Sequence, residues 1–320
     1  MIHHHDTTSL GTCRYRHRDI YYWNSMDAVL DITHLSKLFG SMKAVDDVSF
    51  SIMNGEIFGF LGPNGAGKTT TIRMIMDFLR PTSGTVTLFG LNAITDGVDI
   101  RRRIGYMPAV TSLNERWTGA DHIAYARALR KLPDSANELV QRLELDAIKT
   151  VKQLSTGNRQ KLSLVLAFMF KSDFIILDEP TNGLDPLLQQ TVYEMIDEAH
   201  ARGATIFMSS HNLTEVEKVC TRVGVLRQGA LIAQETIASL QDKHLYKVTL
   251  QFERDVTAAD FDLPNAKVID IRARHVQLTY TGDVQPLLNF VTKMKVHDAT
   301  IDHASLEEHF MEFYDRGGSR

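Results

Sequence analysis

A glycine-rich segment with one lysine and one hydroxyl residue points most directly to chemistry. Residues Gly62, Pro63, Asn64, Gly65, Ala66, Gly67, Lys68 and Thr69 fit the pattern G-x-x-x-x-G-K-[ST], a phosphate-binding loop (P-loop). Glycines let backbone N–H groups turn around an anion, and a following helix N-terminus adds positive dipole. We expect Lys68 to contact the β- and γ-phosphates of ATP and the Thr69 hydroxyl to ligate Mg²⁺. Thr70 is included in the predicted nucleotide site.

An acidic pair follows an apolar run further along the chain. Residues 174–177 are Phe-Ile-Ile-Leu and precede Asp178 and Glu179. Such a run is typical of a parallel strand buried on both faces, and the carboxyl end of such a strand is where open α/β sheets bind ligands. We expect Asp178 to hold Mg²⁺ through a water molecule and Glu179 to polarise an attacking water. A solvated acidic turn is the alternative, which pairing with the P-loop disfavours.

Between these segments lies a sequence that resembles the signature of ATP-binding cassette (ABC) ATPases. The family pattern is Leu-Ser-Gly-Gly-Gln; this chain keeps Leu154, Ser155 and Gly157 and departs from it at Thr156 and Asn158. A serine suits the N-cap of a helix, and an exposed helix N-terminus attracts anions. The resemblance implies that Ser155 and Gly157 bind the γ-phosphate held by a second cassette, so that two ATP molecules join two chains.

Three further segments resemble the same family. Residues 182–185, Asn-Gly-Leu-Asp, match its dimer-contact loop, which usually begins with serine, and Asp185 closes that match. Residues 205–211, Thr-Ile-Phe-Met-Ser-Ser-His, are expected to form a strand ending in His211, as in the family's switch loop. The resemblance implies that this histidine contacts the γ-phosphate and the region of the catalytic glutamate. Phe39 stands where the family stacks an aromatic ring on adenine, a contact worth about 1–3 kcal/mol in nucleic-acid systems; a core position is the alternative.

One departure from the family concerns magnesium. In the family, the segment that matches residues 104–108 is followed by glutamine or glutamate. That side chain contacts Mg²⁺ and links the nucleotide to the membrane partner. This chain has Ala109, which has no hydrogen-bonding group. Water or a neighbour such as Ser112 could fill the position. We therefore still expect hydrolysis, with a slow rate as the open alternative. That hypothesis is wrong if Ala109→Gln leaves the hydrolysis rate and its Mg²⁺ dependence unchanged.

Composition narrows the class of protein. The chain has 320 residues with a formal net charge of −4, which argues against a broad nucleic-acid-binding surface. Arginines 101–103 are interpreted as a solvated helix face. Two cysteines form no disulfide framework and favour a reducing compartment. The longest apolar run, residues 164–170, is far shorter than the ~18 residues of a membrane span. We therefore expect no membrane span and no secretory signal. The resemblance to ABC ATPases implies a peripheral position on the cytoplasmic face of the membrane.

The chain divides into three predicted parts. Residues 1–25 form an extension of unlike composition, either disordered or preceding the true start at Met26. Residues 26–240 alternate strand and helix patterns and form the α/β ATPase domain, a mixed sheet with a helical subdomain. Residues 244–320 form a small α+β domain that resembles the C-terminal extension of bacterial cassettes of the drug- and polyketide-export type. Its last predicted helix opens with a capping box at residues 305–308.

These features favour the ATP-binding, ATP-hydrolysing subunit of an ABC transporter, an exporter with a separate integral membrane permease and a second cassette. A soluble ABC ATPase acting on ribosomes or DNA is one alternative, disfavoured because the chain has a single P-loop and no heptad repeats. The other alternative is an ATP-gated regulatory module that hydrolyses slowly. Ala109 supports that alternative, while Glu179 and His211 oppose it.

Overall fold

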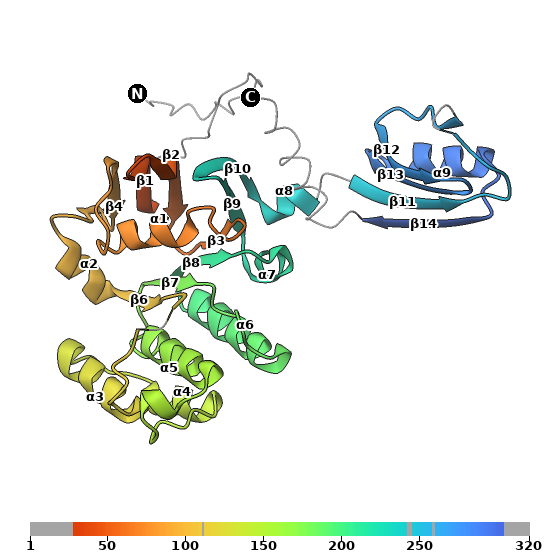
Figure 1. The fold of residues 1–320 in the computed structure, drawn as a ribbon. Coiled ribbons are helices and arrows are strands. Elements are labelled where there is room, and N and C mark those ends of the chain that lie inside the picture. The colour runs from red at the N-terminus through yellow and green to blue at the C-terminus, as the bar shows by residue number, and fades with distance from the viewer. Residues whose placement is uncertain (1–27, 111, 242–244, 258–259, 304–320) are drawn as a thin grey trace, which may run out of the picture.

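The computed structural model describes residues 28–110, 112–241, 245–257 and 260–303 (Figure 1). The predicted extension over residues 1–25 lies outside the described residues, as does the helix expected to open at residues 305–308. Within the described part, no helix is long and apolar enough to cross a membrane.

A six-stranded mixed sheet carries the predicted chemistry. Its strands, in order across the sheet, are β10 (Ala230–Thr236), β9 (Arg222–Arg227), β3 (Ile57–Leu61), β8 (Thr205–Ser210), β7 (Phe174–Asp178) and β6 (Ile104–Met107). All neighbouring pairs are parallel except the β9–β10 hairpin at one edge. The carboxyl ends of β3, β7 and β8 therefore lie at the same edge, where ligands bind in such sheets. The predicted α/β fold with a mixed sheet is confirmed.

The two faces of this sheet contact different cores. Along β3, Phe58 and Phe60 belong to one buried cluster, while Ile57 and Leu61 belong to the other. A second, antiparallel sheet covers the phenylalanine face together with helix α1 (Lys68–Ile75). Its strands, in order, are β2 (Met42–Met53), β1 (Ala28–Phe39), β4 (Ser83–Leu88) and β5 (Leu91–Asn92). Burial on both faces explains why β3 and β7 are continuous apolar runs.

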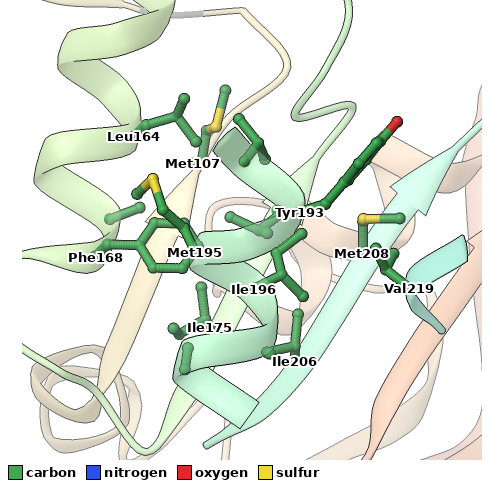
Figure 2. Close-up of a cluster of buried hydrophobic side chains, with 14 of the residues drawn as sticks. Met107, Leu164, Phe168, Ile175, Tyr193, Met195, Ile196, Ile206, Met208 and Val219 are labelled. Carbon is green, nitrogen blue, oxygen red and sulfur yellow. The ribbon is translucent and has the colours of Figure 1, made fainter. Parts of the chain in front are cut away.

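Helices cover the opposite face. The three that pack on it are α5 (Thr156–Phe168), α6 (Pro186–Ala201) and α7 (Leu213–Val219). Figure 2 shows Phe168 of α5 and Met195 of α6 among the side chains of this cluster. The helical subdomain contains α3 (Gly119–Arg130), α4 (Ala136–Arg142) and the 3-10 turn η1 (Val151–Gln153), and α2 (Gly97–Arg103) precedes β6. The packing of α5 and α6 on the sheet fixes where each helix starts relative to the carboxyl ends of the strands.

Two helix boundaries have a local cause. Helix α1 ends at Ile75, and Asp77 just beyond it adopts a left-handed backbone with φ of 56°. Helix α5 begins at Thr156, because the Ser155 side chain caps it directly. This second boundary places the signature residues in the first turn of a helix.

The C-terminal part forms its own antiparallel sheet and core. Its strands, in order, are β12 (Ala266–Arg272), β13 (His275–Thr281), β11 (Leu245–Gln251) and β14 (Asp298–His303), and α8 (Ile237–Gln241) precedes them. Helix α9 (Val284–Lys293) contributes Leu287 to a buried cluster with Val248 and Leu278. The α+β character expected of this part is confirmed, with β12 and β14 as strands that the sequence patterns did not indicate. Its boundary at residue 244 stays a prediction.

Candidate nucleotide-binding site

The P-loop connects the end of β3 to the start of α1. At Gly62 an added Cβ would lie 2.4 Å from the backbone oxygen of Leu226. At Gly67 φ is +108°, and an added Cβ would lie 2.5 Å from the backbone oxygen of Ala44. Both positions therefore require glycine, for space at the first and for space and conformation at the second. At these two positions the loop packs against neighbouring segments, so only backbone fits there.

Lys68 lies between the P-loop and the end of β7. Its side chain is 5% exposed, and Nζ donates to the backbone oxygens of Gly62 at 2.6 Å and Pro63 at 3.3 Å. The same ammonium lies 3.1 Å from Glu179 Oε1. The structure thus brings together two residues that the sequence separates by more than a hundred positions. A lysine ammonium at this point can attract the terminal phosphates of a nucleotide.

Asp178 ends β7 and is fully buried. Its Oδ1 accepts the Ser209 hydroxyl at 2.5 Å, and within the described residues Oδ2 has no hydrogen-bond partner. Burial raises the pKa of Asp178, whereas the hydroxyls of Ser209 and Thr69 act to lower it. An unpartnered buried carboxylate oxygen close to the Thr69 hydroxyl is a donor set that suits a hydrated Mg²⁺, which prefers oxygen ligands and retains waters. These residues therefore fit the predicted metal.

Glu179 and His211 form a hydrogen-bonded pair. His211 Nδ1 lies 2.6 Å from Glu179 Oε2, and the two side chains are 46% and 11% exposed. Glu179 adopts a left-handed backbone with φ of 55°, and its N–H donates to the backbone oxygen and the hydroxyl of Ser209 at 3.2 and 3.1 Å. Such a backbone is costly for a non-glycine residue and is found at functional sites. Oriented by His211 beside Lys68, the carboxylate can act as a general base.

The signature segment lies on the surface at the start of α5. Ser155 accepts the Asn158 N–H at 3.3 Å, and a Cβ added at Gly157 would meet nothing within 4 Å. Helix α5 packs on the face of the sheet opposite α1. No hydrogen bond or ion pair among the described residues joins Ser155 or Gly157 to residues 62–69. The predicted pairing with a phosphate held by another chain needs such an open position.

Two remaining predicted residues are exposed. Asp185 caps α6 by accepting the N–H groups of Leu187 and Leu188 at 3.1 and 3.0 Å, a structural role that leaves its contact role untested. Phe39 ends β1 with 47% exposure, and Lys37 Nζ lies 5.3 Å from its ring centroid. The core alternative for Phe39 therefore does not hold. An exposed ring remains available for stacking.

Sequence reasoning missed four residues that support this site. They are Gln160, Thr181, Ser209 and Glu215. Gln160 of α5 donates to the backbone oxygen of Pro180 at 3.3 Å, which links the signature helix to the segment after Glu179. The sequence feature that could have indicated them is a polar residue within an otherwise apolar strand, helix or turn, because such a residue must find a buried hydrogen-bond partner.

A P-loop between β3 and α1, with an acidic pair at the end of a neighbouring parallel strand, defines a nucleoside-triphosphate-binding α/β protein. Residues 45–182 match the family model described as ABC transporter. The bacitracin transport ATP-binding protein BcrA of Bacillus licheniformis is 30% identical over 310 residues, covering 91% of this chain and 99% of that protein. The Nod factor export ATP-binding protein I of Burkholderia lata is 34% identical, covering 65% of this chain and 70% of that protein.

Solved structures of ABC transporter subunits are similar to this chain in fold. The structure of an ATP-binding subunit of an ABC transporter is similar with a TM-score of 0.62 at 29% identity, covering 67% of this chain and 92% of that chain. A dimeric cassette bound to ADP and Pi in a post-hydrolysis state gives 0.60 at 21% identity, covering 65% and 98%, and supports the fold alone. The chain belongs to the ABC transporter family as an ATP-binding subunit. Its activity is ATP hydrolysis for transport.

Proposed function

We propose that two copies of a cassette, at least one of them this chain, bind MgATP between them and drive export through a separate membrane permease. The relative that the chain covers almost end to end is named for bacitracin transport, and others are named for Nod factor export. The first name supports transport and the second supports export. We infer that the subunit lies peripherally on the cytoplasmic face of the membrane. The transported compound would be selected by the permease.

The observation that carries this proposal is the cluster of Lys68, Glu179 and His211. Lys68 and the backbone of the P-loop would hold the β- and γ-phosphates, while Thr69 and Asp178 would hold Mg²⁺, which neutralises developing phosphate charge. Glu179 would orient and deprotonate the attacking water. His211 would donate through Nδ1–H to Glu179 and, when its ring is doubly protonated, through Nε2–H to the γ-phosphate. Phosphoryl transfer depends mainly on positioning and electrostatics, which these residues supply.

The exposed signature residues support a paired arrangement. Ser155 and Gly157 stand at an uncovered helix N-terminus, a position suited to a phosphate that the same chain does not deliver. A second cassette would bring its nucleotide to this point. ATP binding would then close the pair, and hydrolysis would reopen it, a cycle that can move an attached permease.

Glu179→Gln tests this function. The amide cannot take a proton from water, so steady-state phosphate release should fall at least about a hundredfold while MgATP binding persists. The matched control is Glu217→Gln, because Glu217 is an exposed residue of α7. Capture of the Glu179→Gln protein from native membranes with MgATP should recover a multi-span membrane protein. Recovery of ribosomal or DNA-associated proteins without any membrane chain would overturn the transporter assignment in favour of a soluble ATPase.

A slowly hydrolysing regulatory module remains the second candidate, because one observation favours it. Ala109 follows β6 by two positions and supplies no oxygen ligand to Mg²⁺. Steady-state phosphate release by the wild-type chain and by Glu179→Gln separates the two candidates. A wild-type rate that Glu179→Gln does not lower would favour the regulatory module.

A further inference from the structure

Glu215 is a buried acid that the mechanism above does not use. It lies in α7, four residues after His211, and only 3% of its surface is exposed. Burial raises the pKa of Glu215, and the hydroxyls of Ser210 and Thr181 act to lower it. Removing a carboxyl group from water is costly unless its oxygens find donors, so this position needs a structural explanation.

Both oxygens of Glu215 accept hydroxyl protons from the loops that carry the reacting residues. Oε1 accepts from Thr181 Oγ1 and Oε2 accepts from Ser210 Oγ, each at 2.5 Å. Thr181 stands two residues after Glu179, and Ser210 immediately precedes His211. One carboxyl group therefore joins the segment after β7 to the segment after β8. No other side chain in the described part of the chain accepts hydrogen bonds from both hydroxyls.

The same connection extends to the P-loop. The backbone oxygen of Ser210 accepts the Gly62 N–H at 3.1 Å, so the residue bound by Glu215 also contacts the start of the loop. The Glu179–His211 hydrogen bond of 2.6 Å spans the two segments that Glu215 joins. The length of this bond depends on the spacing of the two segments, because a shift of either backbone moves Glu179 or His211.

We propose that Glu215 is a positioning residue for ATP hydrolysis, which sets the Glu179–His211 geometry by binding Thr181 and Ser210 at once. An ionised carboxyl group is suited to this role because it is acceptor-only and can take both hydroxyl protons. An amide would offer one acceptor and one donor, so one of the two bonds would be lost or reversed. Glu215 itself does not contact the nucleotide in this scheme.

This inference rests on the proposed function, and four variants of the full chain test it. They are Glu215→Gln, Thr181→Val, Thr181→Ser and the control Glu217→Gln. Steady-state phosphate release gives kcat, and titration with a fluorescent ATP analogue gives the dissociation constant. Because misplacement by about 1 Å can cost about a hundredfold, we expect Glu215→Gln and Thr181→Val to lower kcat at least about tenfold. The dissociation constant should stay within about twofold, which separates positioning from binding.

The threonine pair isolates the hydroxyl. Thr181→Ser retains it and should keep kcat within about threefold of wild type, whereas valine matches threonine in shape and lacks it. If Glu215→Gln does not fold, this pair still decides the question. The inference is overturned if Thr181→Val keeps wild-type kcat, or if kcat and affinity fall together. Suppose the wild type hydrolyses ATP and Glu179→Gln abolishes that activity. If Glu215→Gln and Thr181→Val then keep the wild-type kcat, only this inference is refuted. Absent hydrolysis in wild type refutes the proposed function as well.

Discussion

Asp178→Asn should raise the stability of the folded protein. It should also remove the extra stabilisation that Mg²⁺ gives to the ATP complex. The carboxylate is fully buried at the end of β7, and one of its oxygens lacks a partner among the described residues. An unsatisfied buried polar atom costs about 1–3 kcal/mol, and more when charged. Asparagine is isosteric and uncharged: its oxygen can still accept the Ser209 hydroxyl, and its NH2 group can donate to the nearby Thr69 hydroxyl oxygen. We expect a gain of about 1–3 kcal/mol at neutral pH.

The gain should depend on pH in a definite direction. The pKa of Asp178 in the folded protein lies above its ordinary value of 3.8 because the group is buried. The folded state therefore binds more protons than the unfolded state, so wild-type stability falls as pH rises through the raised pKa. Asparagine does not titrate. The advantage of Asp178→Asn should be largest above the raised pKa and should shrink as pH falls towards 3.8.

Thermal unfolding of the full chain in the presence of a chelator measures this effect. For a unit of 150–250 residues, 1 kcal/mol shifts Tm by about 2–4 °C, so the expected rise is about 2–12 °C. MgATP should raise Tm of the wild type more than ATP with chelator does, and this difference should vanish in the variant. The exposed Asp197→Asn on α6 is the control. A lower Tm at neutral pH, or a pH-independent gain, would refute the reasoning.

Two further substitutions test the exposed adenine position and the missing magnesium ligand. Phe39→Ala should leave Tm unchanged, since the ring is 47% exposed, but should weaken ATP binding by about 1–3 kcal/mol in a nucleotide titration. An unchanged affinity would remove Phe39 from the site. Ala109→Gln adds a side-chain carbonyl and should raise kcat several-fold and lower the Mg²⁺ concentration for half-maximal rate. Phosphate release measured across Mg²⁺ concentrations checks this; identical curves would show that residue 109 does not limit hydrolysis.

Much of the candidate site could be predicted from the sequence because its chemistry is encoded in contiguous segments. The P-loop is defined by residues 62–69, and the apolar run at 174–177 leads straight to Asp178 and Glu179. The strand ending before His211 was indicated in the same way. Parallel pairing then brings the ends of β3, β7 and β8 together, so local patterns sufficed for the main residues.

The supporting residues could not be predicted, because their role arises only from contacts distant in sequence. Glu215 has the pattern of an ordinary polar residue on a short helix, and Ser209 of a strand-end serine. Only the packing of α7 against the sheet buries Glu215 beside Thr181 and Ser210. The long antiparallel strands β1 and β2 were likewise missed, since their register shifts interrupt the alternation of apolar and polar residues.

The contact between Lys68 and Glu179 has a consequence for when water can be activated. Glu179 Oε1 lies 3.1 Å from the Lys68 ammonium and Oε2 lies 2.6 Å from His211 Nδ1, so both carboxylate oxygens are already engaged. A γ-phosphate bound at the P-loop would compete for the same ammonium and would free Oε1 for a water molecule. The general base would then stay blocked until the nucleotide to be cleaved displaces the lysine.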